Sequence, residues 1–513
     1  MNGKKQLAIN MIANIVNLLA NLGISFFLSP IIVAKLGAES YGFVTLANNF
    51  VNYISLITIA LNSVSGRFIT IKIHQKDYEK ANMYYNSVLV TNIIFCIILF
   101  VPSVIFIHNL EMFLNISLGI VWNVKILFSL VFVSFYISII GNVYSVATFA
   151  KNRLELSAAR NTILNVFKVI VLICAFTMFS PNIIWMGAVS LLVAVLTIIT
   201  NINYSKKLLP ELKLNIKEFK ISAVKELLIS GYWNTISQVG QILLNGLDIL
   251  LTNLFISPQL MGVVSISKTI PDILGSVAGT LVSAFSPSFT ILYAKGKNEE
   301  LLQEIKQSIK ITGLLLGIPI GGWLAFGQDF FNLWMPTENS KLLYQLSVLA
   351  SLTLFVNGGV SCIYNIFAVT NKLKVNSISL LCSGGINALI VFILLKTTNL
   401  GVYAVVGTST IILIFRNLLV SIPYAAKVCL GQKWYYFYGD VLKTTMSILG
   451  VYIIGICVKK VILINTWGNL IFSGCVVVLV SIIVEYFVAL NKKERQMCKN
   501  FFEQKILKKN RKQ

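Results

Sequence analysis

Apolar residues run through this chain in long stretches that are separated by short polar segments. A membrane-spanning helix needs about 20 mostly apolar residues, and fourteen stretches meet that requirement. They lie near residues 7–35, 42–71, 83–107, 124–150, 160–180, 183–204, 226–256, 259–293, 308–327, 342–370, 375–395, 400–426, 441–463 and 468–490. The predicted fold is an all-α integral membrane bundle of about fourteen transmembrane helices, and the even number places both termini on one side.

Within several stretches polar residues recur every three or four positions, which puts them on one face of a helix. Amides both donate and accept hydrogen bonds, so we interpret these stripes as the wall of a water-filled cavity that binds hydroxyl groups. Interhelical hydrogen bonding is the alternative, although packing contacts are more typical of small residues such as Gly313, Gly317 and Gly321 in the ninth stretch. The stripes are Asn10, Asn14, Asn17, Asn21 and Ser25; Asn48, Asn52, Ser55 and Asn62; Asn234, Gln238, Gln241, Asn245, Asp248 and Thr252; and Ser351, Asn357, Ser361 and Asn365.

The composition agrees with a membrane protein. The 513 residues are 56% hydrophobic and 12% charged, with a mean hydropathy of +0.80. Such a chain lacks the polar surface that a soluble fold needs, and no polar stretch is long enough for a separate soluble domain. The apolar segment after Met1–Lys5 is too long for the core of a signal peptide, so we interpret it as a retained first span.

Lysine and arginine predict the orientation, because they concentrate in cytoplasmic loops. Of the 42 basic residues, 32 lie on the side of the two termini, six on the other side and four within spans. Both termini are therefore predicted to be cytoplasmic. The net charge of +23 lies in short loops and in a basic tail at 491–513. It suits anionic membrane lipids and, without a base-stacking module, argues against nucleic acid.

An internal repeat relates two halves of the chain. A shift of 220 residues, without gaps, aligns five polar or glycine positions, and six spans separate the copies. The halves therefore share one orientation, as in transporters whose halves are related by an axis along the membrane normal. We predict six-helix lobes at 1–220 and 221–426, two extra helices at 427–490 and the tail at 491–513. The aligned pairs are Asn14 with Asn234, Asn21 with Gln241, Ser25 with Asn245, Gly42 with Gly262, and Ser63 with Ser283.

Charged residues inside spans are costly and indicate function. Asp248 and Lys268 each lie ten residues from Pro258 at an outer turn, which predicts an ion pair, and Asp272 lies one turn deeper than Lys268. We interpret this cluster as a coupling site whose pairing changes during transport; a purely structural ion pair is the alternative.

Two arginines are candidates for binding a phosphate group, because guanidinium binds phosphate oxygens bidentately. Arg416 lies about ten residues inside its span, whereas Arg67 lies close to the inner end of its helix, as Lys168 does. Snorkelling to the headgroups is therefore the alternative for Arg67 and Lys168.

Other chemistry is not indicated. The eight cysteines are scattered singly, without metal-ligand spacing or a disulfide pattern, and no nucleotide-binding motif occurs, so we expect neither a metal nor a cofactor. A membrane-bound polymerase would need a sizeable outer loop with paired carboxylates, but the outer segments 108–123 and 328–341 contain only Glu111, Asp329 and Glu338. We expect no enzymatic activity.

Two regions resemble the polysaccharide-biosynthesis family of flippases, within the multidrug/oligosaccharidyl-lipid/polysaccharide exporter superfamily. The resemblance implies export of undecaprenyl-diphosphate-linked oligosaccharide repeat units across a bacterial cytoplasmic membrane by alternating access, with a glycan polymerase or glycosyltransferases as partners. The residues that carry it are Asn10, Pro30, Leu36, Gly37, Glu39, Tyr41, Gly42, Gly66, Arg67 and Phe68 in the first two spans, and Asp248, Thr252, Leu254, Gly262 and Val263 in the seventh and eighth.

Two departures from this family keep other substrates open. The thirteenth and fourteenth spans exceed the twelve-helix core, as in the related lipid II flippases, so a peptidoglycan or teichoic-type precursor is an alternative. A cation-coupled multidrug exporter is another, and the lack of an acidic residue in the first span counts against it. The cavity residues that we predict are Asn14, Asn17, Asn21, Ser25, Asn48, Asn52, Arg67, Asn234, Gln238, Gln241, Asn245 and Arg416, and the coupling residues are Asp248, Lys268 and Asp272.

Overall fold

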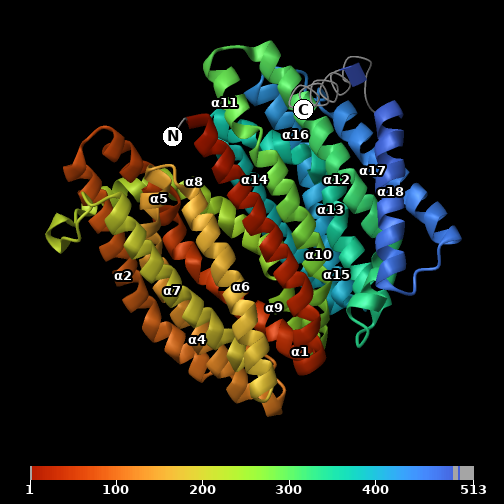
Figure 1. Ribbon diagram of the computed structural model, residues 1–513, viewed down its shortest axis with the longest axis horizontal. Coiled ribbons are helices and arrows are strands. Elements are labelled where there is room, and N and C mark those ends of the chain that lie inside the picture. The colour runs from red at the N-terminus through yellow and green to blue at the C-terminus, as the bar shows by residue number, and fades with distance from the viewer. Residues whose placement is uncertain (1–2, 489–494, 497–513) are drawn as a thin grey trace, which may run out of the picture. The chain divides into compact units, whose positions relative to one another are not determined.

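The computed structural model describes residues 3–488 and 495–496 (Figure 1). In these residues twelve helices are long and apolar enough to cross a membrane. One of the twelve, Ile9–His74, contains two of the predicted spans, and the predicted span at 226–256 is a further helix that a π-helical turn interrupts. The prediction of an all-α membrane bundle of about fourteen helices is confirmed. The predicted basic tail at 491–513 lies outside the described residues, apart from Arg495 and Gln496.

The helices follow the apolar stretches closely. Through the first half of the chain they are α1 Gly3–His74, α2 Tyr78–His108, α3 Leu110–Phe113, η1 Leu118–Ile120, α4 Val121–Asn142, η2 Val143–Ser145, α5 Val146–Ala150, α6 Leu154–Met178, α7 Ile184–Leu208, η3 Ile216–Glu218, α8 Ile221–Gln241, η4 Ile242–Gly246 and α9 Asp248–Phe255. In the second half they are α10 Pro258–Ser283, α11 Ser286–Ala294, α12 Asn298–Trp334, α13 Ser340–Val369, α14 Leu373–Thr397, α15 Val402–Arg416, η5 Asn417–Ser421, α16 Ile422–Tyr424, η6 Ala425–Cys429, α17 Tyr438–Val461 and α18 Trp467–Val488.

Local sequence explains where helices bend and begin. Gly37 divides α1 with a φ of 82° and a ψ of 163°, a conformation that glycine adopts without steric cost. The carboxylate of Asp77 caps α2 by accepting the backbone N–H of Lys80 at 3.1 Å, and the Asn339 side chain caps α13 by accepting that of Leu342 at 3.1 Å. These caps satisfy amide groups that lack a partner within the first helical turn.

The contacts divide the chain into two compact units. The first contains the described residues up to Ser267 together with Lys374–Ser409, and the second contains Lys268–Leu373 and the described residues from Thr410 onward. This division by contact differs from the predicted boundaries at 220 and 426. Those boundaries follow a sequence repeat, and the predicted two-lobe organisation stays a prediction.

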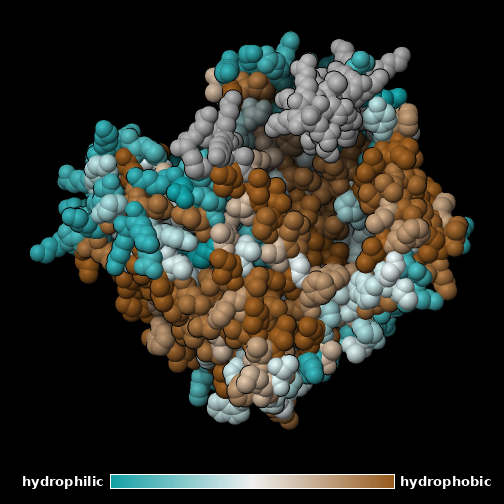
Figure 2. All heavy atoms as spheres, in the orientation of Figure 1, coloured by the Kyte–Doolittle hydropathy of each residue, from teal (hydrophilic) through white to brown (hydrophobic). Residues whose placement is uncertain are grey.

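In the first unit α2, α4, α6 and α7 form a layer of neighbouring helices (Figure 1). The C-terminal end of α1 packs on α2, α5 and α8 through a core that includes Leu61, Tyr85, Val88 and Leu227. The outward faces of these helices are apolar, and Figure 2 shows hydrophobic atoms over α2 and α4. Hydrophilic atoms gather at the end where the 209–220 segment lies, as a helix bundle in a bilayer requires.

In the second unit α12 packs closely on α17 along a row of glycines. A Cβ atom at Gly313 would lie 2.1 Å from Thr444 Cγ2, and one at Gly321 would lie 2.7 Å from the Val451 Cβ. Because only glycine permits this approach, the spacing of Gly313, Gly317 and Gly321 marks a helix-packing face, as predicted.

Candidate functional site

The first unit contains an open cavity of about 770 Å³, which we call the polar cavity. It lies among the second half of α1, the α4–α5 segment, the start of α6 and the end of α7. Eleven of its lining residues have neutral polar side chains, Arg160 is its one charged residue, and the other nine are apolar residues or glycine, so that apolar atoms supply most of the lining surface. The polar lining consists of Ser55, Thr58, Asn62, Ser63, Ser138, Asn142, Ser145, Thr148, Ser157, Arg160, Thr197 and Asn201.

Arg160 is held in place by neighbouring amides. Its guanidinium donates to the side-chain oxygen of Asn201 on α7 and, from Nη2, to that of Asn161 at 2.9 Å. Asn201 is itself 4% exposed and donates to the Gly141 carbonyl at 3.4 Å. No lining residue is acidic, so the positive charge of Arg160 has no carboxylate neighbour in the wall. Such a site favours an anionic ligand that also carries hydroxyl groups.

The polar stripes predicted from the sequence include only part of the lining of this cavity. The second predicted stripe supplies Ser55 and Asn62, but Asn48 and Asn52, the residues of that stripe that we predict to line the cavity, are exposed and lie outside the lining. Two signals were available and missed. Ser134, Ser138, Asn142, Ser145 and Thr148 recur at helical spacing in the fourth span, and Arg160 is the first residue of the predicted span at 160–180.

The first predicted stripe divides between two roles. Asn17 accepts a hydrogen bond from Thr162 Oγ1 at 3.3 Å, and Asn21 accepts one from the Asn165 amide, so both join α1 to α6. Asn14 and Ser25 are exposed. At about 100° per residue, Asn17 and Asn21 point in nearly the same direction, whereas Asn14 and Ser25 lie toward the edge of the stripe.

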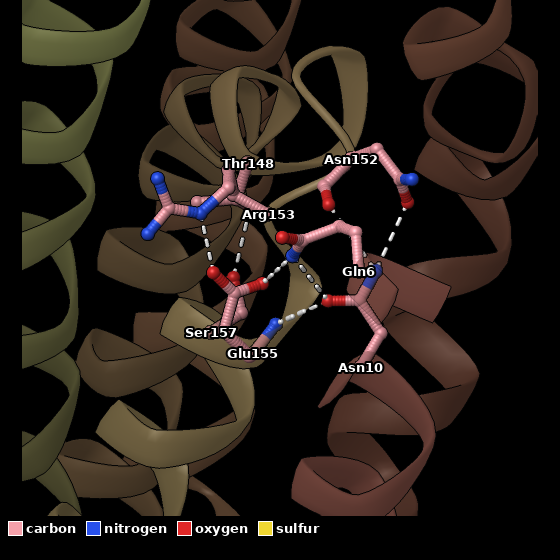
Figure 3. A network of polar contacts seen from close by, with 7 residues as sticks. All are labelled: Gln6, Asn10, Thr148, Asn152, Arg153, Glu155 and Ser157. Carbon is pink, nitrogen blue, oxygen red and sulfur yellow. Dashed lines mark hydrogen bonds and ion pairs between the residues drawn. The ribbon is translucent and has the colours of Figure 1, made fainter. Parts of the chain in front are cut away.

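The N-terminal end of that stripe is a hydrogen-bond network (Figure 3). Asn10, 3% exposed, donates to the Asn152 side chain at 3.0 Å and to its carbonyl at 3.2 Å. Asn10 Oδ1 accepts from the backbone N–H of Glu155 at 3.1 Å, and Gln6 bridges to the Glu155 carboxylate at 2.8 Å. For Asn10, Asn17 and Asn21 the structure therefore shows interhelical hydrogen bonds.

The seventh-span stripe surrounds a break in its helix. The π-helical segment η4 interrupts the i→i−4 ladder at Ile242–Gly246, and such breaks free a backbone carbonyl. The Gly246 carbonyl accepts from Tyr53 Oη and from Asn49 Nδ2 of α1. Of the stripe residues, Asn234 is exposed and donates to Ser63 at 3.1 Å, and Gln241 is exposed, whereas Gln238 and Asn245 are half-buried.

The predicted coupling residues belong to different units. Asp248 is 1% exposed at the start of α9 in the first unit. Lys268 is half-buried and Asp272 is exposed on α10, both in the second unit and one helical turn apart. The ion pair between Asp248 and Lys268, and the coupling role of the three residues, stay predictions.

The two predicted phosphate-binding arginines lie in contrasting surroundings. Arg67 is exposed, with its guanidinium carbon 5.6 Å from the centre of the Phe68 ring. Arg416 is 6% exposed, and its Nη1 lies 3.5 Å from both Tyr364 Oη and Asn417 Oδ1. Arg416 is thus enclosed by side chains of its own unit.

Two pairs of residues related by the 220-residue repeat contact each other at the predicted outer end. Gln259 Nε2 donates to Glu39 Oε2 at 3.3 Å. A Cβ atom at Gly42 would lie 2.9 Å from the Gly262 Cα, and one at Gly262 would lie 2.0 Å from the Ala38 carbonyl oxygen. Equivalent residues of a repeat touch where they lie near its axis, so the contact accords with the predicted symmetry. We call this contact the outer crossing.

A loop packs beside the outer crossing. Glu39 also accepts hydrogen bonds from the Ser117 backbone N–H at 3.2 Å and from its hydroxyl at 2.9 Å. Asn115 and the buried Asn253 exchange three hydrogen bonds of 2.8 to 3.0 Å. In the same segment the hydrogen bond from Lys125, whose Nζ lies 2.8 Å from the carboxylate, holds the pKa of Glu111 below its usual range. These contacts hold the segment 111–117 against the outer crossing and the end of α9.

Metal binding gains no support from the described residues, since residues 3–488 and 495–496 contain no group of three or more His, Cys, Asp or Glu side chains that could hold an ion.

Comparisons with known proteins place the fold. No protein-family model matches the chain. It is 26% identical over 489 residues to the uncharacterized membrane protein EpsK of Bacillus subtilis, covering 95% of this chain and 96% of that protein. Among solved structures it is similar to the lipid II flippase MurJ in an inward closed conformation, with a TM-score of 0.65, 14% identity and coverage of 95% and 100%.

It is also similar to an inward-facing multidrug resistance MATE family transporter of the MOP superfamily, with a TM-score of 0.60, 15% identity and coverage of 87% and 98%. The chain has the fold that these flippases and transporters share.

Proposed function

We propose that this protein is a flippase that moves undecaprenyl-diphosphate-linked oligosaccharide repeat units across the bacterial cytoplasmic membrane for surface polysaccharide biosynthesis. The observation that carries the proposal is the polar cavity, whose lining combines hydroxyl and amide groups with one guanidinium and no carboxylate. A sugar needs many donors and acceptors, and a diphosphate needs positive charge in a low-dielectric setting. Arg160 would supply that charge.

Alternating access follows from the outer crossing in this proposal. The two repeats meet there through Gly42 and Gly262 and through the hydrogen bond from Gln259 to Glu39. Movement of the repeats about their shared axis would separate these contacts and open the outer end. The predicted cavity residues Asn14, Asn48, Asn52, Arg67, Asn234 and Gln241 are exposed, and we propose that they line the path of the headgroup. A role for Arg416 in binding the phosphate stays part of the proposal.

The proposal includes a setting in the cell. Both termini would face the cytoplasm, because 32 of 42 basic residues lie on their side. The substrate would arrive from glycosyltransferases on that side and pass to a glycan polymerase outside, and the basic tail would contact anionic lipids.

Two alternatives rest on specific observations. A lipid II or teichoic-type precursor is favoured by the MurJ-like fold, which covers 95% of this chain. A cation-coupled drug exporter is suggested by the similarity to MATE transporters, but the polar cavity contains no carboxylate to bind a cation. The charge of the cavity therefore favours an anionic, lipid-linked substrate over a cationic drug.

Reconstitution tests the proposal directly. Proteoliposomes would contain a fluorescent undecaprenyl-diphosphate oligosaccharide, and an impermeant quencher would report the fraction of lipid in the outer leaflet. We expect the wild type to equilibrate the leaflets and Arg160→Gln to slow the exchange about tenfold or more, the loss expected for one charge-assisted hydrogen bond. Lys151→Gln, an exposed change in the adjacent loop, is the control.

The outcomes of this experiment distinguish the proposed function from its two alternatives. Exchange of lipid II but not of the oligosaccharide lipid would favour the first alternative, and proton-driven uptake of a cationic dye would favour the second. A wild-type rate in Arg160→Gln would remove the polar cavity from the substrate path.

A further inference from the structure

A second cavity, of about 630 Å³, lies in the second unit among α12, α17 and α18. We call it the basic groove. Its lining changes in character along the helices, from charged residues at one end to mostly apolar ones further in. The lining consists of Lys306, Gln307, Lys310, Leu314, Asp440, Leu442, Lys443, Thr444, Met446, Ser447, Gly450, Val451, Ile454, Ser481, Val484 and Glu485.

The charged end carries three lysines. Lys306 Nζ lies 3.9 Å from the centre of the Tyr436 ring, which directs the ammonium group without neutralising it. Lys443 Nζ lies 3.9 Å from Asp440 Oδ1, with 78% of its side chain exposed, so this ion pair is weak. Lys310 lies one turn beyond Lys306 on α12. The positive-inside count places this end of α12 and α17 at the cytoplasmic surface.

The deeper part is apolar and open to one side. Leu442 and Met446 are 57% and 56% exposed, and a Cβ atom at Gly450 would meet nothing within 4 Å. The one carboxylate at this depth, Glu485, accepts a hydrogen bond from the Ser447 hydroxyl. Three lysines against two carboxylates leave the groove with a positive formal charge.

We propose that the basic groove binds an anionic phospholipid of the surrounding membrane, with the phosphate between Lys306, Lys310 and Lys443 and one acyl chain along Leu442, Met446 and Gly450. Basic pockets between transmembrane helices at the cytoplasmic side are suited to anionic lipid headgroups. The basic segment that follows α18, with nine Lys and Arg against two Glu between 491 and 513, is a poorer occupant because it repeats the charge of the lysines. The proposal does not depend on the transported substrate.

Thermal unfolding of the purified full-length protein tests the charge. With phosphatidylglycerol added in place of phosphatidylcholine, we expect the midpoint of the wild type to rise by several degrees, because a ligand that binds only the folded state stabilises it. The triple variant Lys306→Gln, Lys310→Gln, Lys443→Gln should lose most of that rise. A matched triple variant of exposed loop lysines, Lys151→Gln, Lys213→Gln, Lys217→Gln, should keep it. An equal rise in both triple variants overturns the proposal.

Two glycine variants test whether the groove holds an acyl chain, and both are expected to fold. Gly450→Leu fills open space in the groove, so it should fold normally and lose the phosphatidylglycerol response. Gly439→Leu, also open but outside the lining, should keep it. A response to glycerol phosphate that matches the response to phosphatidylglycerol would overturn the acyl-chain part of the proposal.

Crosslinking identifies the occupant. A photoreactive residue in place of the exposed Met446 should yield an adduct with the mass of a phospholipid. An adduct with a peptide from the chain's own C-terminal segment, or with another protein, would overturn the assignment.

Discussion

The outer crossing allows a quantitative prediction for Gly262→Ala. The new Cβ would lie 2.0 Å from the Ala38 carbonyl oxygen and 2.3 Å from its carbon, whereas ordinary contact between heavy atoms begins near 3.5 Å. The two helices must therefore separate by about 1.5 Å at this point. Both clashing atoms belong to backbone, which cannot rotate aside, so the cost lies at the upper end of overpacking, about 3 kcal/mol.

Helix propensity does not offset that cost. Alanine is favoured over glycine inside a helix by about 1 kcal/mol, but α10 is helical whether the crossing is closed or open, so the penalty on the closed crossing stays at about 3 kcal/mol. That penalty raises the population of the open crossing about 160-fold. The control is Gly275→Ala on the same helix, where a Cβ meets nothing within 4 Å, and this variant should not open the crossing.

The assay is labelling of a single buried cysteine. Ser40→Cys replaces a residue that is 7% exposed near the crossing, in a background without other reactive cysteines. An impermeant maleimide should react about 160-fold faster when Gly262→Ala is added, because labelling follows the open population. Equal labelling rates in Gly262→Ala and Gly275→Ala would refute the packing argument.

Three further predictions concern packing and topology. Asn10→Ala should lower the free energy of unfolding by about 2 kcal/mol, since it breaks four hydrogen bonds around a buried amide. Asn14→Ala should cost under about 0.5 kcal/mol, and similar thermal shifts in the two variants would contradict this. Gly313→Ala should destabilise the α12–α17 contact by about 2 kcal/mol. The control is Gly322→Ala, whose Cβ meets nothing within 4 Å, and chemical denaturation compares the stability of the two variants. In the variant Pro210→Cys the new thiol should not react with impermeant thiol reagents added to intact cells. Labelling from outside would contradict the predicted cytoplasmic position of this loop.

The sequence predicts the membrane-spanning helices well because their determinants are local. An apolar stretch long enough to cross a bilayer must form a helix there, since no other partner exists for its backbone groups. The stretches at 42–71 and 441–463 correspond to helical segments within α1 and α17. The glycine row on α12 was likewise readable, because packing of this kind depends on residue size at fixed helical spacing.

The roles of the polar residues depended on tertiary structure. The spacing of Asn10, Asn14, Asn17 and Asn21 shows that they share a helix face, but an amide on that face is equally suited to water and to a neighbouring helix. The position of α6 decides that Asn17 and Asn21 form interhelical hydrogen bonds. The helical period shows in which direction a side chain points from its own helix, whereas a cavity forms only when several helices are placed beside one another.

The polar cavity and the outer crossing show the same limit. Ser55, Asn142, Arg160 and Asn201 come from four helices and converge only after these helices pack. Even the repeat, which the sequence does contain, could not show that its equivalent positions meet at Gly42 and Gly262. The sequence thus determines which segments enter the membrane and which faces are polar, and the packing of helices determines which of those faces become a binding site.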